Sequence, residues 1–163
     1  MRKSNPAGTD KSNNLGWHSE DFDLENEQPK YFINSISTNL NEAFKDMGWD
    51  IKNQEVKVTS MWSVINKKNA SNARHIHSNN YISAAYYVKT SENSGDIVFH
   101  DPRSVTTFRY PRISERNTLN SNVFSIKPKE GLLVLFPSYL YHSVAENYSD
   151  EERIVISFNI DIK

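Results

Sequence analysis

Short apolar segments separated by turn residues run through the last two thirds of this chain, and they constrain its fold more than any other feature. Residues 82–88 form a compact apolar run, and residues 154–162 form the longest alternating one. The stretches between such segments are rich in Asn, Ser, Gly and Pro, which favour turns. The expected strands are residues 56–60 with a continuation over 61–65, then 82–88, 96–99, 123–126, 132–136 and 154–162. Many short strands at this spacing predict a mainly β protein, a sandwich or jelly roll.

One amphipathic helix is expected ahead of these strands, roughly over residues 29–47. Pro29 suits the first turn of a helix, and Gly48 suits the position just past its end. The apolar residues between them fall at helical spacing, namely Phe32, Ile33, Ile36, Leu40, Ala43, Phe44 and Met47. We expect this helix to pack on the back of a sheet. Residues 1 to about 15 are almost entirely polar, which predicts a flexible tail, and residues 16–163 are expected to form one domain.

Composition narrows the class of protein. The chain has 163 residues, a formal net charge of −1 and no cysteine. Disulfides, thiolate nucleophiles and Cys-ligated metals are therefore excluded, and the charge argues against general nucleic-acid binding. No apolar run is long enough to span a membrane, and no signal-peptide pattern is present. We expect a cytoplasmic protein without a membrane partner, and the sequence leaves open whether it forms a homo-oligomer.

Histidines carry the chemistry of the chain. His75 and His77 are separated by one residue, so on a strand they would point the same way, about 6.5–7 Å apart. His142 follows an expected strand and could close a set of three metal ligands, and imidazole suits iron, zinc, copper and nickel. His18 lies near the expected tail and is set aside. His100 is only a minor candidate for the site.

The last expected strand has two different faces. Arg153, Val155, Ser157 and Asn159 alternate onto one face, and the opposite face is wholly apolar. The polar face is therefore expected to line a pocket, in which Arg153 could hold an anionic co-substrate beside the metal.

Five segments together resemble the 2-oxoglutarate (2OG) and Fe(II)-dependent oxygenases. The resemblance spans roughly residues 58–162 and is strongest to the prolyl-hydroxylase-like branch, within it to a group of small 2OG-Fe(II) oxygenase-like proteins of marine bacteria and phages. The matching segments are residues 74–77 (RHIH) at the His-x-Asp metal motif, 85–88 (AYYV), 95–99 (GDIVF), 128–136 (PKEGLLVLF) leading to the distal histidine, and 153–158 (RIVISF). The resemblance implies a double-stranded β-helix, the cupin-like form of the jelly roll.

The resemblance also implies roles for single residues. His75 and His142 would bind Fe(II), and Arg153 would pair through its planar fork with the distal carboxylate of 2OG. Tyr87 matches a tyrosine whose hydroxyl reaches the co-substrate, and Ser157 could donate to the same carboxylate.

Two further side chains are candidates for the pocket wall. Ser83 lies four residues before Tyr87 on the same strand face, and Asn159 ends the polar face of the last strand. The implied activity is a dioxygenase that uses O2 to hydroxylate a small-molecule or peptidyl substrate, with release of succinate and CO2. The substrate itself is not indicated by the sequence.

Position 77 departs from the family pattern, because a histidine stands where the second ligand is usually a carboxylate. Three arrangements are open. His77 ligates and gives a three-histidine site, or His77 does not ligate and a position stays open, or Asp101 supplies the oxygen from the end of its strand. We favour the first, because the spacing places His77 toward the metal.

Two other classes of protein compete with the oxygenase. One is a cupin-like three-histidine metalloenzyme that does not use 2OG, and the other is a non-catalytic β-sandwich binding module. Residues 103–122 form a long polar insertion with four arginines. It is either a lid beside the metal or a solvated loop.

Overall fold

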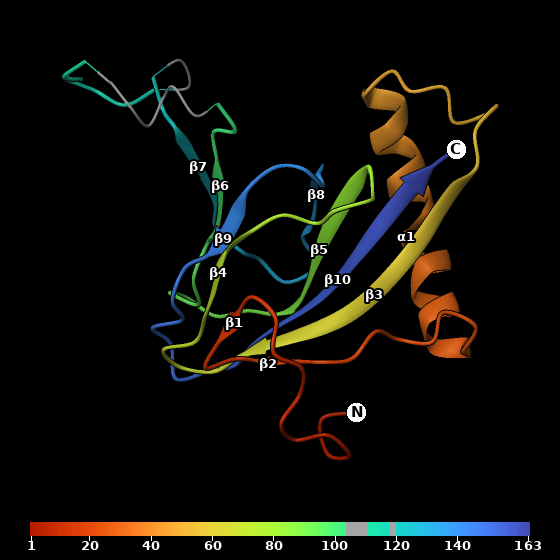
Figure 1. Ribbon diagram of the computed structural model, residues 1–163, viewed down its shortest axis with the longest axis horizontal. Coiled ribbons are helices and arrows are strands. Elements are labelled where there is room, and N and C mark those ends of the chain that lie inside the picture. Colours follow the sequence, from red (N-terminus) through yellow and green to blue (C-terminus); the bar gives the residue numbers. More distant parts are fainter. Residues whose placement is uncertain (104–110, 118–119) are drawn as a thin grey trace.

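Two five-stranded antiparallel sheets face each other in the computed structural model, which describes residues 1–103, 111–117 and 120–163 (Figure 1). One, which we call the short-strand sheet, has the order β1 (Asn13–Asn14), β4 (Ser71–His75), β9 (His142–Val144), β6 (Ile97–His100), β7 (Val123–Ile126). The other, the long-strand sheet, has the order β2 (Trp17–His18), β3 (Val56–Asn66), β10 (Arg153–Ile162), β5 (Ile82–Lys89), β8 (Leu133–Pro137). The mainly β jelly roll expected from the sequence is confirmed.

β10 lies at the centre of the long-strand sheet and has the two faces that its sequence predicts. Its apolar face contributes Ile156, Phe158 and Ile160 to the core beneath the helix. Its other face, which begins at Arg153, lines the space between the two sheets. Alternation along an extended strand separates the two sets, so one strand serves both the core and the interior cavity.

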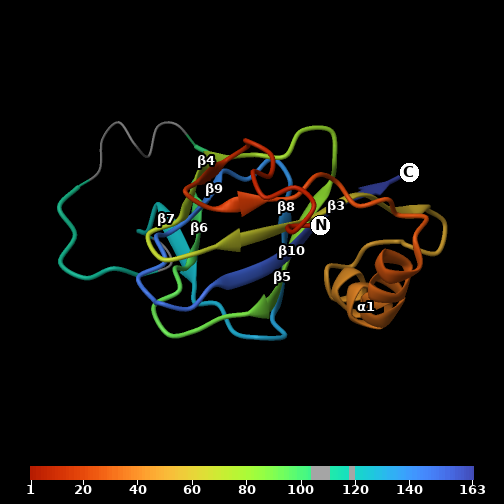
Figure 2. The same cartoon turned by 90° about the horizontal axis from the view of Figure 1, so that it is seen from below.

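The helix α1 spans Glu27–Asp46, within two residues of the expected bounds. Its buried face consists of Pro29, Ile36, Leu40 and Phe44. The chain leaves the helix through Gly48, whose φ of 72° is the left-handed conformation that glycine adopts without steric cost. α1 covers the outer face of the long-strand sheet and lies away from the short-strand sheet (Figures 1 and 2).

The N-terminal segment is more closely attached than a flexible tail would be. Asn13 and Asn14 pair with β4, at the edge of the short-strand sheet. Trp17 and His18 pair with β3, at the edge of the long-strand sheet, and both are buried. We call residues 11–21 the strap, because this segment runs from one sheet edge to the other (Figure 2). Part of the expected tail therefore belongs to the fold.

The expected lid falls partly outside the described residues. Residues 104–110 and 118–119 of the 103–122 insertion are not described, so its role stays a prediction. Within the described part of the chain, none of the helices combines the length and apolar character needed to cross a membrane.

Candidate metal and co-substrate site

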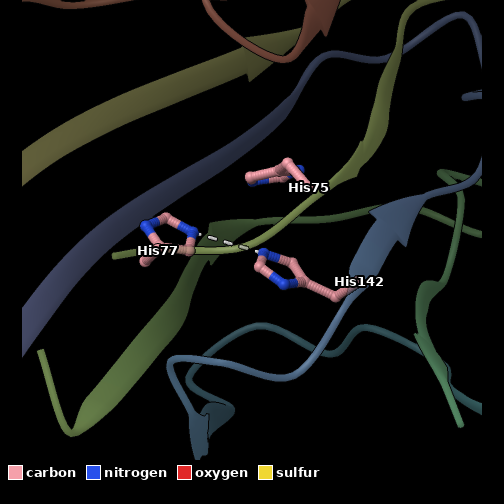
Figure 3. A group of neighbouring side chains, drawn as sticks. All are labelled: His75, His77 and His142. Atoms are coloured by element: carbon pink, nitrogen blue, oxygen red, sulfur yellow. Dashed lines mark hydrogen bonds between the residues drawn. The ribbon is translucent and has the colours of Figure 1, made fainter. Parts of the chain in front are cut away.

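Three histidines converge where two short strands meet. His75 ends β4 and is the direct cross-strand partner of His142, which begins β9. His77 lies two residues beyond the end of β4, and its backbone N–H donates to the Ser138 carbonyl at 3.0 Å. His75 and His77 therefore do not share a strand, which was the condition under which their side chains would point the same way. The loop after the strand, held by Ser138, places His77 beside the other two rings (Figure 3).

The separation of the ring nitrogens fits one metal ion. Nε2 of His77 lies 3.3 Å from Nε2 of His142, and one nitrogen from each of the three rings lies within 4.8 Å of the others. Donor atoms about 2.1 Å from a common ion stand roughly 3.0 Å apart at octahedral angles and roughly 3.4 Å apart at tetrahedral angles. The His77–His142 pair falls inside this range.

Main-chain carbonyls fix the tautomers of two of these rings. Nδ1 of His75 donates to the Ala73 carbonyl at 2.7 Å, and Nδ1 of His142 donates to the Leu140 carbonyl at 3.0 Å. A carbonyl only accepts, so each Nδ1 carries the proton and each Nε2 keeps its lone pair. This is the arrangement in which neighbours orient a histidine for metal binding.

Burial keeps the three imidazoles neutral. Burial, together with the neighbouring histidines, lowers the pKa of His77 to about 3 and that of His142 to about 4. Burial also lowers the pKa of His75, against the opposing effect of its bond to Ala73. At neutral pH all three are in the neutral form that binds a metal.

Aromatic rings extend the histidine group toward the strap. His18, Trp62 and His77 stack in series, with centroid separations of 5.8 and 5.3 Å and interplanar angles of 16° and 18°. His77 in turn stacks on His142 at 5.1 Å and 10°. His18 was set aside on sequence grounds, but the structure brings it to the site. In the sequence around His18, only the apolar neighbour Trp17 indicated burial of this histidine.

No carboxylate joins the histidines in the described part of the chain. Asp101 instead forms an ion pair with Arg103, at 2.6 Å, and this contact lowers the pKa of Asp101 to about 2. His100 is also engaged elsewhere, because its Nε2 lies 2.9 Å from the Ser143 hydroxyl. The arrangement in which Asp101 supplies an oxygen is thus not the one observed.

A cavity of about 560 Å³ lies between the sheets and joins the histidines to the polar face of β10. Arg153 lies in its wall and is only 2% exposed. Nη1 of Arg153 donates to the carbonyls of Ser94, at 2.9 Å, and Gly95, at 2.7 Å. Burial lowers the pKa of Arg153 to about 10, so the guanidinium stays charged at neutral pH.

Other expected residues surround Arg153. Tyr87 is buried beside it, and burial raises the pKa of this phenol to about 12, so the hydroxyl stays protonated and can donate. Ser157 and Asn159 line the cavity, as the alternation along β10 predicts.

Ser83 lies one layer behind the cavity wall. Its hydroxyl contacts the Ser138 hydroxyl and Oδ1 of Asn159, each at 2.8 Å. Nδ2 of Asn159 donates to the Ser60 hydroxyl at 3.0 Å. Ser83 therefore holds Asn159 in place and is not itself among the lining residues.

Two facing antiparallel sheets, three converging histidines and a buried arginine are the arrangement of a double-stranded β-helix protein with a metal-binding site. Residues 60–159 match the family described as "Putative 2OG-Fe(II) oxygenase". The match covers more than half of the chain, which therefore belongs to this family. Membership confirms the family expected from the sequence, and the three histidines fit the iron site that its description implies.

Solved structures of the same class share the fold. A 2OG-Fe(II) oxygenase-family oxidoreductase from Burkholderia pseudomallei superposes with a TM-score of 0.63 at 12% identity, over 85% of this chain and 58% of that one. A Pseudomonas putida prolyl-4-hydroxylase gives 0.61 at 12%, over 98% and 79%. HygX from Streptomyces hygroscopicus, solved with nickel and 2-oxoglutarate, gives 0.61 at 10%, over 98% and 76%.

These likenesses are in fold and not in sequence. The chain spans less than two thirds of the Burkholderia protein, so that protein has parts without a counterpart here. No curated protein matches the chain.

Proposed function

We propose that this protein is a 2OG- and Fe(II)-dependent dioxygenase in which His75, His77 and His142 hold the iron and Arg153 anchors 2OG. The reaction would hydroxylate a substrate bound in the same cavity and release succinate and CO2. One observation carries the proposal. Three neutral imidazoles and one buried guanidinium, with Tyr87 beside it, line a single cavity.

Arg153 has unused hydrogen-bonding capacity. Two N–H groups of Nη1 are satisfied by main-chain carbonyls, but Nε is buried without a partner and no described residue accepts from Nη2. A buried charge with unpaired donors is costly. A carboxylate lying against the guanidinium would remove part of that cost, and the planar fork suits it geometrically. The Tyr87 and Ser157 hydroxyls would supply further donors to the same anion.

His77 is the third ligand in this proposal, in place of a carboxylate. Three neutral imidazoles contribute no negative charge to balance that of the ion. An anionic co-substrate is therefore favoured at the remaining positions, since charges attract more strongly in a buried site than in water. When bound, Fe(II) supplies the oxidative chemistry, while the protein supplies orientation and a partly enclosed cavity.

A three-histidine metalloenzyme that does not use 2OG is the second candidate, favoured by the all-histidine ligand set. Arg153 separates the two candidates, because only the dioxygenase needs an anion anchor in the cavity. We also propose a cytoplasmic location, since a chain without cysteine fits a reducing compartment.

Succinate formation tests the proposal. The protein is supplied with Fe(II), 2OG and O2, and succinate is measured. Replacing Arg153 with Lys keeps the charge but loses the fork, and should weaken anaerobic 2OG binding at least about tenfold while metal affinity is unchanged. Arg2, an exposed arginine paired with Glu152, provides the control variant Arg2→Ala.

The outcomes separate the candidates. Absence of succinate, together with no rise in melting temperature when 2OG is added to the metal-loaded protein, would favour the second candidate. Equal loss of metal and 2OG in the Arg153→Lys variant would show that the division of roles is wrong.

A further inference from the structure

The strap brings a hydroxyl group to the histidines. Oγ of Ser12 lies 3.4 Å from Nε2 of His75, and Ser12 lines the same cavity as the three rings. Ser12 lies outside residues 60–159, so the family match assigns it no role. It is one of four strap residues that line the cavity, together with Lys11, His18 and Asp21.

Hydrogen bonds determine where the Ser12 proton points. Nδ2 of Asn66 donates to Oδ1 of Asn72 at 3.0 Å, and Nδ2 of Asn72 donates to Oγ of Ser12 at 3.2 Å. Nδ1 of His75 donates to the Ala73 carbonyl, so its Nε2 can only accept. The Ser12 O–H is therefore directed at the nitrogen lone pair that a metal ion would use.

A metal on His75 removes the acceptor for that proton. The Ser12 O–H must then rotate away, while Asn72 continues to occupy one lone pair of the oxygen. A hydroxyl oxygen has two lone pairs, so rotation frees the second one to face the ion. The hydrogen bonds from buried Asn66 and Asn72 hold the oxygen in place during this change.

The distance agrees with shared coordination. Two donors bound at about 2.1 Å to one ion at a tetrahedral angle stand roughly 3.4 Å apart. Oγ of Ser12 and Nε2 of His75 have this separation. The distance between Nε2 of His77 and Nε2 of His142 agrees with it to within 0.1 Å. An oxygen donor is also what the ligand set lacks, since the usual carboxylate is absent.

We propose that the Ser12 hydroxyl is an oxygen ligand of the metal ion, in place of the missing carboxylate. The proposal rests on the proposed function, because it presupposes that His75, His77 and His142 hold the ion. Asn72 acts through Ser12 and is a positioning residue.

Cobalt binding tests this without any turnover. Co(II) is titrated into the metal-free protein, and the affinity is followed by the intrinsic tryptophan fluorescence, to which Trp62 beside His77 contributes. The visible absorption reports the ligands of the ion. We expect Ser12→Ala to weaken Co(II) binding about tenfold and to shift the visible bands. Ser12→Thr keeps the hydroxyl and should restore both.

A carboxylate at the same position provides the sharper variant. Ser12→Asp should bind Co(II) at least about tenfold more tightly than the unmodified protein, because it adds a charged oxygen to a neutral ligand set. Asn14→Asp adds the same charge on β1 at an exposed position, and should change the affinity less than about threefold. Circular dichroism and thermal unfolding check that each variant is folded.

The outcomes are distinct. Unchanged affinity in both Ser12→Ala and Ser12→Asp would place the hydroxyl outside the coordination shell and overturn the proposal. Tighter binding by Ser12→Ala would overturn it as well, because Ser12 would then compete with the ion for His75. Failure of the unmodified protein to bind Co(II), or undiminished binding by His142→Ala, would instead overturn the proposed function.

Discussion

The two sheets hold the two ends of the cavity by different means. In the long-strand sheet, β3, β10 and β5 have eleven, ten and eight residues, and β10 pairs along its length with both neighbours. In the short-strand sheet, β4, β9 and β6 have five, three and four. Arg153 and Tyr87 belong to the long strands, whereas His75 and His142 stand at the ends of short ones.

This difference shows how the side chains at each end of the cavity are held in position. Arg153 and Tyr87 are positioned by the continuous hydrogen-bonded ladders that join β3, β10 and β5. The apolar face on the other side of this sheet is covered by α1. The histidine end has fewer ladder bonds, and its rings are fixed by single bonds to nearby carbonyls, by ring stacking and by contact with the strap. We therefore expect the two ends to respond differently to mutation and to acid.

Core truncation should produce the largest contrast. Phe158 on β10 is 0% exposed and packs edge-on against Phe32 of α1, at 6.1 Å between ring centroids. Phe158→Ala should lower the free energy of unfolding by about 3–5 kcal/mol. Phe124 on β7 is 61% exposed, and Phe124→Ala should change it by less than about 0.5 kcal/mol. Urea unfolding followed by circular dichroism measures both, and equal losses would show that the sheets do not differ in this way.

Acid should produce the next largest contrast, because it should destabilise the histidine end of the cavity and not the arginine end. The pKa values of His75, His77 and His142 are lowered in the folded protein, to about 3 for His77 and about 4 for His142. An unfolded histidine has a pKa of about 6.5, so below that pH the unfolded chain binds more protons than the folded one. The metal-free protein should keep its full stability above about pH 6.5 and lose it progressively as the pH falls toward 4.

The acid effect should be confined to the histidine end. Arg153 and Tyr87 titrate at about 10 and about 12, so their charge states are constant over this range. Hydrogen exchange at pH 5 and pH 7, corrected for intrinsic rates, should show loss of protection in β4 and β9 before β10. Saturating Zn(II) should suppress that loss. Uniform loss across both sheets would contradict the comparison.

Displacement of the strap should have the smallest effect on stability. A Cβ on Gly16 would overlap the side chain of Asn66, which is fully buried. Gly16→Ala should therefore loosen the strap, cost about 1–3 kcal/mol and weaken Co(II) binding as Ser12→Ala does. Asn14→Ala, at an exposed position of β1, provides the control. Wild-type affinity for Co(II) in the Gly16→Ala variant would show that the metal end does not depend on the strap.

Much of the fold follows from local patterns in the sequence. The helix was predictable because a 3.6-residue period between Pro29 and Gly48 needs no knowledge of the rest of the chain. The polar face of β10 was predictable for the same reason, with a period of two. Such predictions succeed for β3, β10 and β5, which are long enough to show alternation.

The strap and part of the site could not be predicted in this way. β1 and β2 have two residues each, too few to establish a period. His18 is placed by its stacking on Trp62, forty-four positions away, and Ser12 by its contact with His75. His77 is placed by a bond to Ser138 beyond the end of a strand. Such contacts depend on the assembled fold and leave no local pattern.

The double attachment of the strap also affects solubility. β1 and β2 cover the outer edges of β4 and β3, which lie at the same side of the two sheets. Unpaired strand edges are templates for association with other chains, and a short covering strand is one way in which proteins block them. A chain that loses the first twenty residues would expose two such edges at once. The strap is thus expected to protect the protein from edge-to-edge aggregation.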